Sequence, residues 1–324
     1  MEEERFTPSV PQGEQQKAYE DTDLTFEPLL TADDLKPIRK VYLFAPNDEG
    51  EEHPSSRSSA PSAATDSEDP YESGFVLYNV LSPSECSYYI ERAEALGLEN
   101  CGYDTNYRNT DRVVANSEAT SRLIWERIKD FIFDIDVEPK KAKCSVGKAY
   151  RLEGHWKAHQ LNECWRLCRY KPGGHFAPHF DGTFIRSFHE RSMKTFMLYL
   201  NGDFEGGTTN FVKEGQELYK DETGIYRAQE HNILQKLKPE PGMALVFNHR
   251  ILHEGGQVLS NQKYIMRSDI LFSRDPSSVD IDPKEQEALR MLEQAEDLET
   301  DRRAEEAARL YRSAFKLWPP LERI

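Results

Sequence analysis

The chain contains 324 residues, of which 30% are charged, and its formal net charge at pH 7 is −16. This negative charge argues against binding to nucleic acid or to an anionic membrane, although it is still compatible with a local basic groove. No window approaches the 18 consecutive apolar residues of a transmembrane helix, and the acidic residues 2–4 do not resemble a signal peptide. A cytoplasmic or nuclear location is therefore expected.

Changes in composition divide the chain into four predicted segments. Residues 1–46 form an N-terminal extension, which is polar at first and apolar enough after Leu24 to dock on a domain. Residues 47–70 are rich in Ser, Pro, Ala, Asp and Glu, and such a segment buries too little apolar surface to fold, so a disordered linker is expected. Residues 71–274 are long enough for one domain with a full core, and residues 275–324 form a C-terminal helical segment.

A strand and two helices are expected at the start of this domain. Residues 74–80 have a strand composition, and the helix expected at 83–96 begins with a capping box in which Ser82 and Glu85 satisfy each other's backbone donors. A second helix is expected at 118–133, because its apolar residues recur at helical spacing.

The second half of the domain has the pattern of a β structure. From residue 163 onward, short strands alternate with turns that contain Gly, Asn and Pro. This alternation is typical of an antiparallel jelly roll made of two sheets. The expected fold class is α+β, mainly β, with helices flanking a double-stranded β-helix core.

The sequence His-Phe-Asp contains two candidate metal ligands, His179 and Asp181. On an extended strand, residues i and i+2 point to the same face, so both side chains can reach one ion. A distant His253 would complete a set of two histidines and one carboxylate, which leaves coordination positions open and is typical of non-heme Fe(II) oxygenases. His175 and His249 are rivals, since each lies four residues before one of these histidines.

A series of motifs surrounds these candidate ligands, at residues 169–182, 193–201, 205–211, 241–247, 252–256 and 263–272. With these motifs in this order, residues 162–272 resemble the prolyl 4-hydroxylase-like branch of the 2-oxoglutarate and Fe(II)-dependent dioxygenases. The resemblance implies that His179, Asp181 and His253 bind Fe(II), because Leu-His-Glu-Gly matches the family's distal-histidine segment. The two rival histidines are then expected near the mouth of the site.

The same resemblance implies a binding site for 2-oxoglutarate. Lys263 follows the distal histidine by ten residues, which is the family's spacing for the cation that binds the remote carboxylate. Arg267 is the alternative cation, or a second contact nearer the iron, since it lies on the same strand face and its planar fork suits a carboxylate. Tyr170, Thr209 and Thr195 match further pocket positions, although Thr195 could equally be an ordinary strand residue.

The activity implied by the resemblance is hydroxylation of a C–H bond, first of all in a prolyl residue of a protein or peptide. Fe(II), 2-oxoglutarate and O2 would be required, succinate and CO2 would be released, and ascorbate is expected as the reductant. A dioxygenase acting on a small molecule or a modified base would share the same iron site. A non-catalytic binding module with the same barrel is the third hypothesis. The polar residues 107–112 are interpreted either as a solvated loop or, by resemblance, as a lid that faces the substrate.

The end of the chain changes composition again after residue 275. Residues 283–298 and 301–317 are expected to form two amphipathic helices. Residues 307–319 are similar to the second helix of a tetratricopeptide unit, and a single such unit cannot bury its own apolar face. The hairpin is therefore expected either to pack on the catalytic domain or to bind a protein partner.

Overall fold

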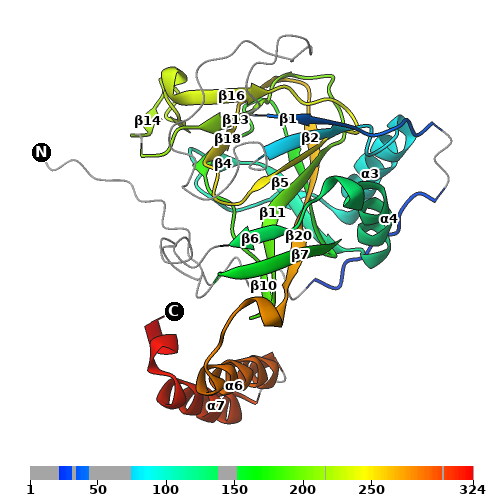
Figure 1. Cartoon of the computed structure of the whole chain (residues 1–324). Helices are drawn as coiled ribbons and strands as arrows, with labels where there is room; N and C mark the ends of the chain where they lie inside the picture. The colour runs from blue at the N-terminus through cyan, green and yellow to red at the C-terminus, as the bar shows by residue number, and fades with distance from the viewer. Residues whose placement is uncertain are drawn as a thin grey trace, which may run out of the picture.

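The computed structural model describes residues 22–30, 34–43, 74–137, 152–215, 217–300 and 303–323. The polar segment 1–21 and the linker expected at 47–70 lie outside the described residues. The described part is mainly β with flanking helices, and its core consists of two antiparallel sheets (Figure 1). This is the jelly-roll fold class that the strand pattern predicts.

The larger sheet has eleven strands within the described residues. Its main path runs through β1 (Arg39–Tyr42), β2 (Gly74–Tyr78), β17 (Ala244–Asn248), β11 (Glu190–Tyr199), β20 (Lys263–Arg274), β8 (Cys164–Tyr170), β5 (Asp111–Asn116) and β3 (Glu99–Asn100). Three further strands pair beside this path, namely β10 (Ile185–Ser187), β7 (Gly154–Leu161) and β6 (Ile135–Val137).

The smaller sheet carries the segment with the candidate ligands. Its order is β16 (Ile233–Leu237), β13 (Thr209–Val212), β18 (His253–Gly255), β9 (His175–His179) and β4 (Arg108–Asn109). Two short pairs complete the described strands, β12 (Glu205–Gly206) with β19 (Val258–Ser260) and β14 (Tyr219–Lys220) with β15 (Tyr226–Arg227).

Side chains of the larger sheet alternate between two hydrophobic layers. In β11, Phe196 and Leu198 pack with helices α3 (Pro83–Leu96) and α4 (Glu118–Ile128), which cover one face of the sheet (Figure 1). Met197 and Tyr199 instead pack with residues of the smaller sheet. This period of two leaves the space between the sheets for a site, because the helices occupy the other face.

Helix α3 has the predicted bounds and the predicted cap. The hydroxyl of Ser82 accepts a hydrogen bond from the backbone N–H of Glu85, whose carboxylate accepts one from the N–H of Ser82 at 2.9 Å. The carboxylate of Glu85 is fully buried and also pairs with Arg127 of α4 at 2.7 Å. The cap therefore joins the two helices. Helix α4 ends at Ile128 and continues as a short 3-10 turn, so the helix expected at 118–133 is too long by several residues.

The solvated loop expected at residues 107–112 is wrong. β4 pairs with β9 and β5 pairs with β8, and Arg108 and Thr110 are buried in this segment. The strands were hidden in the sequence because their inward residues include arginines, which give no apolar alternation. The segment nevertheless faces the cavity described below, as the lid interpretation requires, but it does so as paired strands.

The C-terminal segment forms two helices, α6 (Pro283–Thr300) and α7 (Ala304–Leu317), which pack on each other at one end of the molecule (Figure 1). Their apolar contacts include Phe188, at the turn between β10 and β11. The backbone N–H of Phe188 also donates to Glu293 at 3.2 Å, so the hairpin contacts its own chain. Among the described residues, no helix combines the length and the apolar character needed to cross a bilayer.

We predict that Arg127→Ala lowers the free energy of unfolding by about 3 kcal/mol, because it leaves the buried carboxylate of Glu85 without its cation. Urea denaturation followed by circular dichroism would measure the change. Arg122→Ala is the matched control, since Arg122 lies on the same helix and pairs with Glu118 in solvent. Equal stability of the Arg127→Ala and Arg122→Ala proteins would contradict this account of the cap.

Candidate metal centre and its cavity

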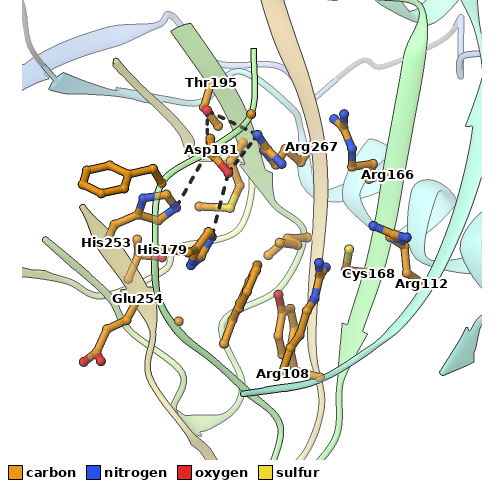
Figure 2. Close-up of a pocket in the computed structure, with 18 of the residues that line it drawn as sticks. Arg108, Arg112, Arg166, Cys168, His179, Asp181, Thr195, His253, Glu254 and Arg267 are labelled. Carbon is orange, nitrogen blue, oxygen red and sulfur yellow. Dashed lines mark hydrogen bonds and ion pairs between the residues drawn. The ribbon is translucent and has the colours of Figure 1, made fainter. Parts of the chain in front are cut away.

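The smaller sheet places the three candidate ligands together. β9 and β18 are neighbours, and His253 lies directly opposite His179 in their register. Asp181 follows the end of β9, and its carboxylate oxygens lie 3.8 Å from Nε2 of His179 and 3.7 Å from Nε2 of His253. The three ligand atoms lie within 4.8 Å of one another (Figure 2). One ion can therefore contact all three.

Both histidines have a nitrogen free for a metal. Nδ1 of His179 lies 2.8 Å from the carbonyl of Ala177, and Nδ1 of His253 lies 3.0 Å from the carbonyl of Ile251. A carbonyl only accepts, so each Nδ1 must carry the proton and each Nε2 must carry the lone pair. Partners of this kind fix the orientation of metal-binding histidines.

Burial and charge favour the protonation states that a metal requires. Burial lowers the pKa of both histidines, and that of His179 falls well below its usual value, so both imidazoles are neutral. Burial alone would raise the pKa of Asp181, but the positive charge of Arg267 outweighs it and holds that pKa well below its usual range. Two neutral imidazoles and one carboxylate form the donor set that Fe(II) oxygenases use, and these residues fit that metal.

The carboxylate of Asp181 is held by the larger sheet. Thr195 of β11 donates to it at 2.5 Å, and Arg267 of β20 pairs with it at 2.9 Å. Since the Thr195 proton goes to Asp181, Nδ1 of His249 must donate to the Thr195 oxygen at 2.9 Å, and Nε2 of His249 then accepts from Ser192. Thr195 thus orients the carboxylate of Asp181, one of the three candidate metal ligands.

The expectation that the two rival histidines lie near the mouth of the site is wrong. His249 is 3% exposed and lies behind Thr195, while His175 is 3% exposed and its ring nitrogens lie near the carbonyls of Gly173 and Asn106. Both histidines are held by polar groups inside the protein, which spacing along the sequence does not reveal.

Lys263 occupies a different part of the cavity from Asp181. Its ammonium group is buried, donates to the carbonyl of Gly207 at 2.6 Å and lies near the rings of Tyr170 and Tyr199. The hydroxyl of Tyr199 is hydrogen-bonded to Thr209 at 2.7 Å. Burial lowers the pKa of Lys263 to about 7. Within the described ranges Lys263 has no carboxylate partner, whereas Arg267 is paired with Asp181.

The candidate residues line one cavity of about 270 Å³ between the two sheets. It also contains three cations that the sequence did not single out, Arg108, Arg112 and Arg166 (Figure 2). Arg166 could have been found, because it lies four residues before Tyr170 on the same strand and so on the same face. Arg108 and Arg112 had no such signal, since their segment was interpreted as a loop or a lid.

Comparison with known proteins agrees with this site. Residues 165–268 match the model of the 2OG-Fe(II) oxygenase superfamily. A putative prolyl 4-hydroxylase of Acanthamoeba polyphaga mimivirus is 25% identical over 221 residues, which cover 61% of this chain and 74% of that protein.

Solved structures of prolyl hydroxylases are also similar to this chain. The 2OG complex of the viral collagen prolyl hydroxylase vCPH from Paramecium Bursaria Chlorella virus-1 is 20% identical, with a TM-score of 0.38, and covers 62% of this chain and 96% of its own. A Pseudomonas putida prolyl-4-hydroxylase is 14% identical, with a TM-score of 0.38, and covers 63% and 94%. These matches identify residues 165–268 as part of a 2OG-Fe(II) oxygenase domain, so the protein is an oxidoreductase, and its sequence is similar to that of a prolyl 4-hydroxylase.

Proposed function

We propose that this chain hydroxylates a prolyl residue of a protein or peptide, with Fe(II), 2-oxoglutarate and O2, and releases succinate and CO2. The observation that carries the proposal is the cavity itself, in which a complete two-histidine, one-carboxylate set and a buried lysine without a carboxylate partner among the described residues line the same space. When bound, the metal and the co-substrate would supply the oxidising chemistry, and the protein would supply their placement.

In this proposal each residue has a defined task. His179, Asp181 and His253 hold the metal through three ligand atoms on one side. Lys263 binds the remote carboxylate of 2-oxoglutarate, with Tyr170 beside it. Burial deprives the ammonium group of Lys263 of its hydration, and the ion pair with 2-oxoglutarate offsets part of that cost.

Arg267 and the two threonines then act through their neighbours. Arg267 and Thr195 orient the carboxylate of Asp181, and Thr209 holds the Tyr199 hydroxyl next to the co-substrate end. The paired Arg267 is less suited than Lys263 to bind the remote carboxylate. These are positioning roles, since none of the three is required to touch the reacting C–H bond.

The choice of a peptide substrate is supported by the mimiviral relative, which is named as a putative prolyl 4-hydroxylase. An oxygenase for a small molecule or a modified base would use the same metal site, so the choice depends on a substrate test.

We also propose that residues 71–274 form the catalytic domain and that ascorbate keeps the iron reduced. The hairpin at 275–324 is proposed to bind a protein partner. The proposed location of the protein is the cytoplasm or the nucleus.

Incubation with Fe(II), ascorbate and 2-oxoglutarate should yield succinate, and proline-rich peptides should increase the yield and gain one oxygen atom. His179→Ala should lower succinate release by more than about 100-fold, because loss of an outer-shell partner alone costs up to that factor in metal affinity. Succinate and peptide mass would be measured, with the exposed His231→Ala as control. Undiminished turnover by His179→Ala would reject the iron assignment, and stimulation only by amino acids or nucleotides would favour the alternative.

Lys263→Met should raise the KM for 2-oxoglutarate roughly 10- to 100-fold, the range expected for one charge-assisted hydrogen bond. The wild-type KM should also depend on pH. Below its lowered pKa of about 7 the lysine is charged and ready to bind a carboxylate, whereas at higher pH binding must first take up a proton, so KM rises with pH. Succinate release measured across this range checks both statements. If KM still rises with pH in Lys263→Met, a group other than Lys263 causes the pH dependence.

A further inference from the structure

Two arginines on the wall of the cavity have no anionic partner among the residues that the structure describes. Arg108 lies on β4 and Arg112 on β5, and both line the cavity. Within the part of the chain that the structure describes, neither forms an ion pair. Arg108 is 8% exposed, and its Nε is buried without a hydrogen-bond partner. Burying an unpaired cation is unfavourable unless a ligand compensates it.

Arg108 is close to the candidate metal ligands. The ring of Phe176 stacks on the imidazole of His179, with the ring centroids 3.5 Å apart. The Cζ of Arg108 lies over the same Phe176 ring, 4.3 Å from its centroid. One ring face can hold only one stacked group, so Arg108 occupies the face opposite His179. This cation–π contact requires no hydrogen bond from the guanidinium, whose Nε has no hydrogen-bond partner among the described residues.

The two arginines share one part of the cavity. Arg112 lies opposite Cys168 in the β5–β8 register, and the guanidinium groups of Arg108 and Arg112 lie on either side of Cys168 (Figure 2). Both charges also act on Cys101, whose pKa is raised by burial and lowered by Arg108 and Arg112. Since both arginines line the same cavity, an anion that enters it meets the positive charge of both.

The remaining charges of the cavity are already balanced. Arg267 pairs with Asp181, and Arg166 pairs with Asp269 at 3.4 Å. The charges of the proposed metal and co-substrate would cancel each other, and Lys263 would contact the remote carboxylate of that co-substrate. The loaded site therefore keeps an excess of positive charge, in which Arg108 and Arg112 are the cations that neither a described carboxylate nor the proposed co-substrate contacts.

The other anion in the wall does not neutralise the two arginines. The carboxylate of Glu254 accepts hydrogen bonds from Asn210 at 2.8 Å and from the backbone N–H of Ala228 at 3.1 Å. Figure 2 shows this carboxylate pointing away from Arg108 and Arg112. Among the described residues no carboxylate pairs with the two arginines, which leaves them for an anionic ligand that enters the cavity.

We propose that Arg108 and Arg112 form a subsite for the carboxylate of an aspartate or glutamate side chain that lies near the hydroxylated residue of the substrate. This inference rests on the proposed peptide hydroxylation and names the substrate class as acidic, proline-containing peptides. The planar fork of an arginine matches a carboxylate through two parallel hydrogen bonds. The chain as a whole has a net charge of −16 and therefore repels acidic peptides. Only a peptide whose carboxylate reaches Arg108 and Arg112 gains a compensating attraction, so the pair selects substrates by the position of the acid.

The test uses the full chain loaded with Mn(II) and 2-oxoglutarate, so that binding is measured without turnover. Fluorescent proline peptides are compared in pairs that differ only by Asp or Asn at each position flanking the proline, together with phosphoserine and Lys versions. In at least one pair, the Asp peptide should bind roughly tenfold or more tightly than the Asn peptide, as expected for charge-assisted hydrogen bonds. Arg112→Gln and Arg108→Gln should abolish this difference, and Arg112→Glu should favour the Lys peptide.

Arg122→Gln, an exposed arginine of α4, is the matched control and should keep the wild-type preference. Thermal unfolding shows whether each variant folds, and the half-buried Arg112 keeps the test valid if Arg108→Gln does not fold. Equal binding within all pairs, failure to bind any acidic peptide, or a preference for phosphoserine without one for Asp would overturn the proposal. A raised KM for 2-oxoglutarate in Arg112→Gln, measured without peptide, would overturn it as well.

The failure of the proposed function would look different. Hydroxyproline in the bound peptides is measured separately, with Fe(II) and O2 present. Selective binding of Asp peptides without hydroxylation would contradict prolyl hydroxylation and would still support the anion subsite. If the Asp and Asn peptides are both hydroxylated and bind with equal affinity, the activity is supported and the subsite is rejected.

Discussion

The proposed metal site depends on the register between β9 and β18. Their antiparallel pairing places His253 directly opposite His179, although the two residues lie in distant parts of the sequence. Opposed residues in such a pair have Cα atoms about 5 Å apart, so two imidazoles can reach one ion. A slip of one residue would turn one of them to the other face of the sheet. The fold must fix this register before any ligand geometry exists.

The second constraint is the packing between the two sheets. Asp181 lies beyond the end of β9, and its carboxylate is held by Thr195 and Arg267 of the larger sheet. Behind Thr195, His249 continues the chain of hydrogen bonds to Ser192. The orientation of Asp181 therefore depends on how the sheets pack, which is a property of the whole hydrophobic layer between them. Local strand propensity alone could not supply it.

Features that depend on neighbouring residues could be predicted from the sequence, whereas features that depend on the packing of the two sheets could not. The start of α3 is encoded locally by Ser82 and Glu85, so its cap and its bounds were confirmed. The His-Phe-Asp pattern identified two residues that the structure brings together with His253. Strand alternation does not explain Asp181, however, because it lies beyond the end of β9 and is held by Thr195 and Arg267. The burial of His249 was misjudged, since it depends on contacts with residues 54 and 57 positions away in the sequence. No spacing rule contains that information.

The arginines of the cavity were missed for a related reason. Strands are recognised by apolar alternation, and a strand whose inward residues are cations looks like a solvated loop. Net charge is equally uninformative, because a total of −16 does not exclude a small region in which Lys263, Arg108 and Arg112 face one cavity. Burying Lys263 and Arg108 opposes folding, and anions that enter the cavity remove part of this penalty. Binding of anionic ligands should thus stabilise the fold that holds the candidate metal ligands in register, which would couple the proposed substrate recognition to the integrity of the site.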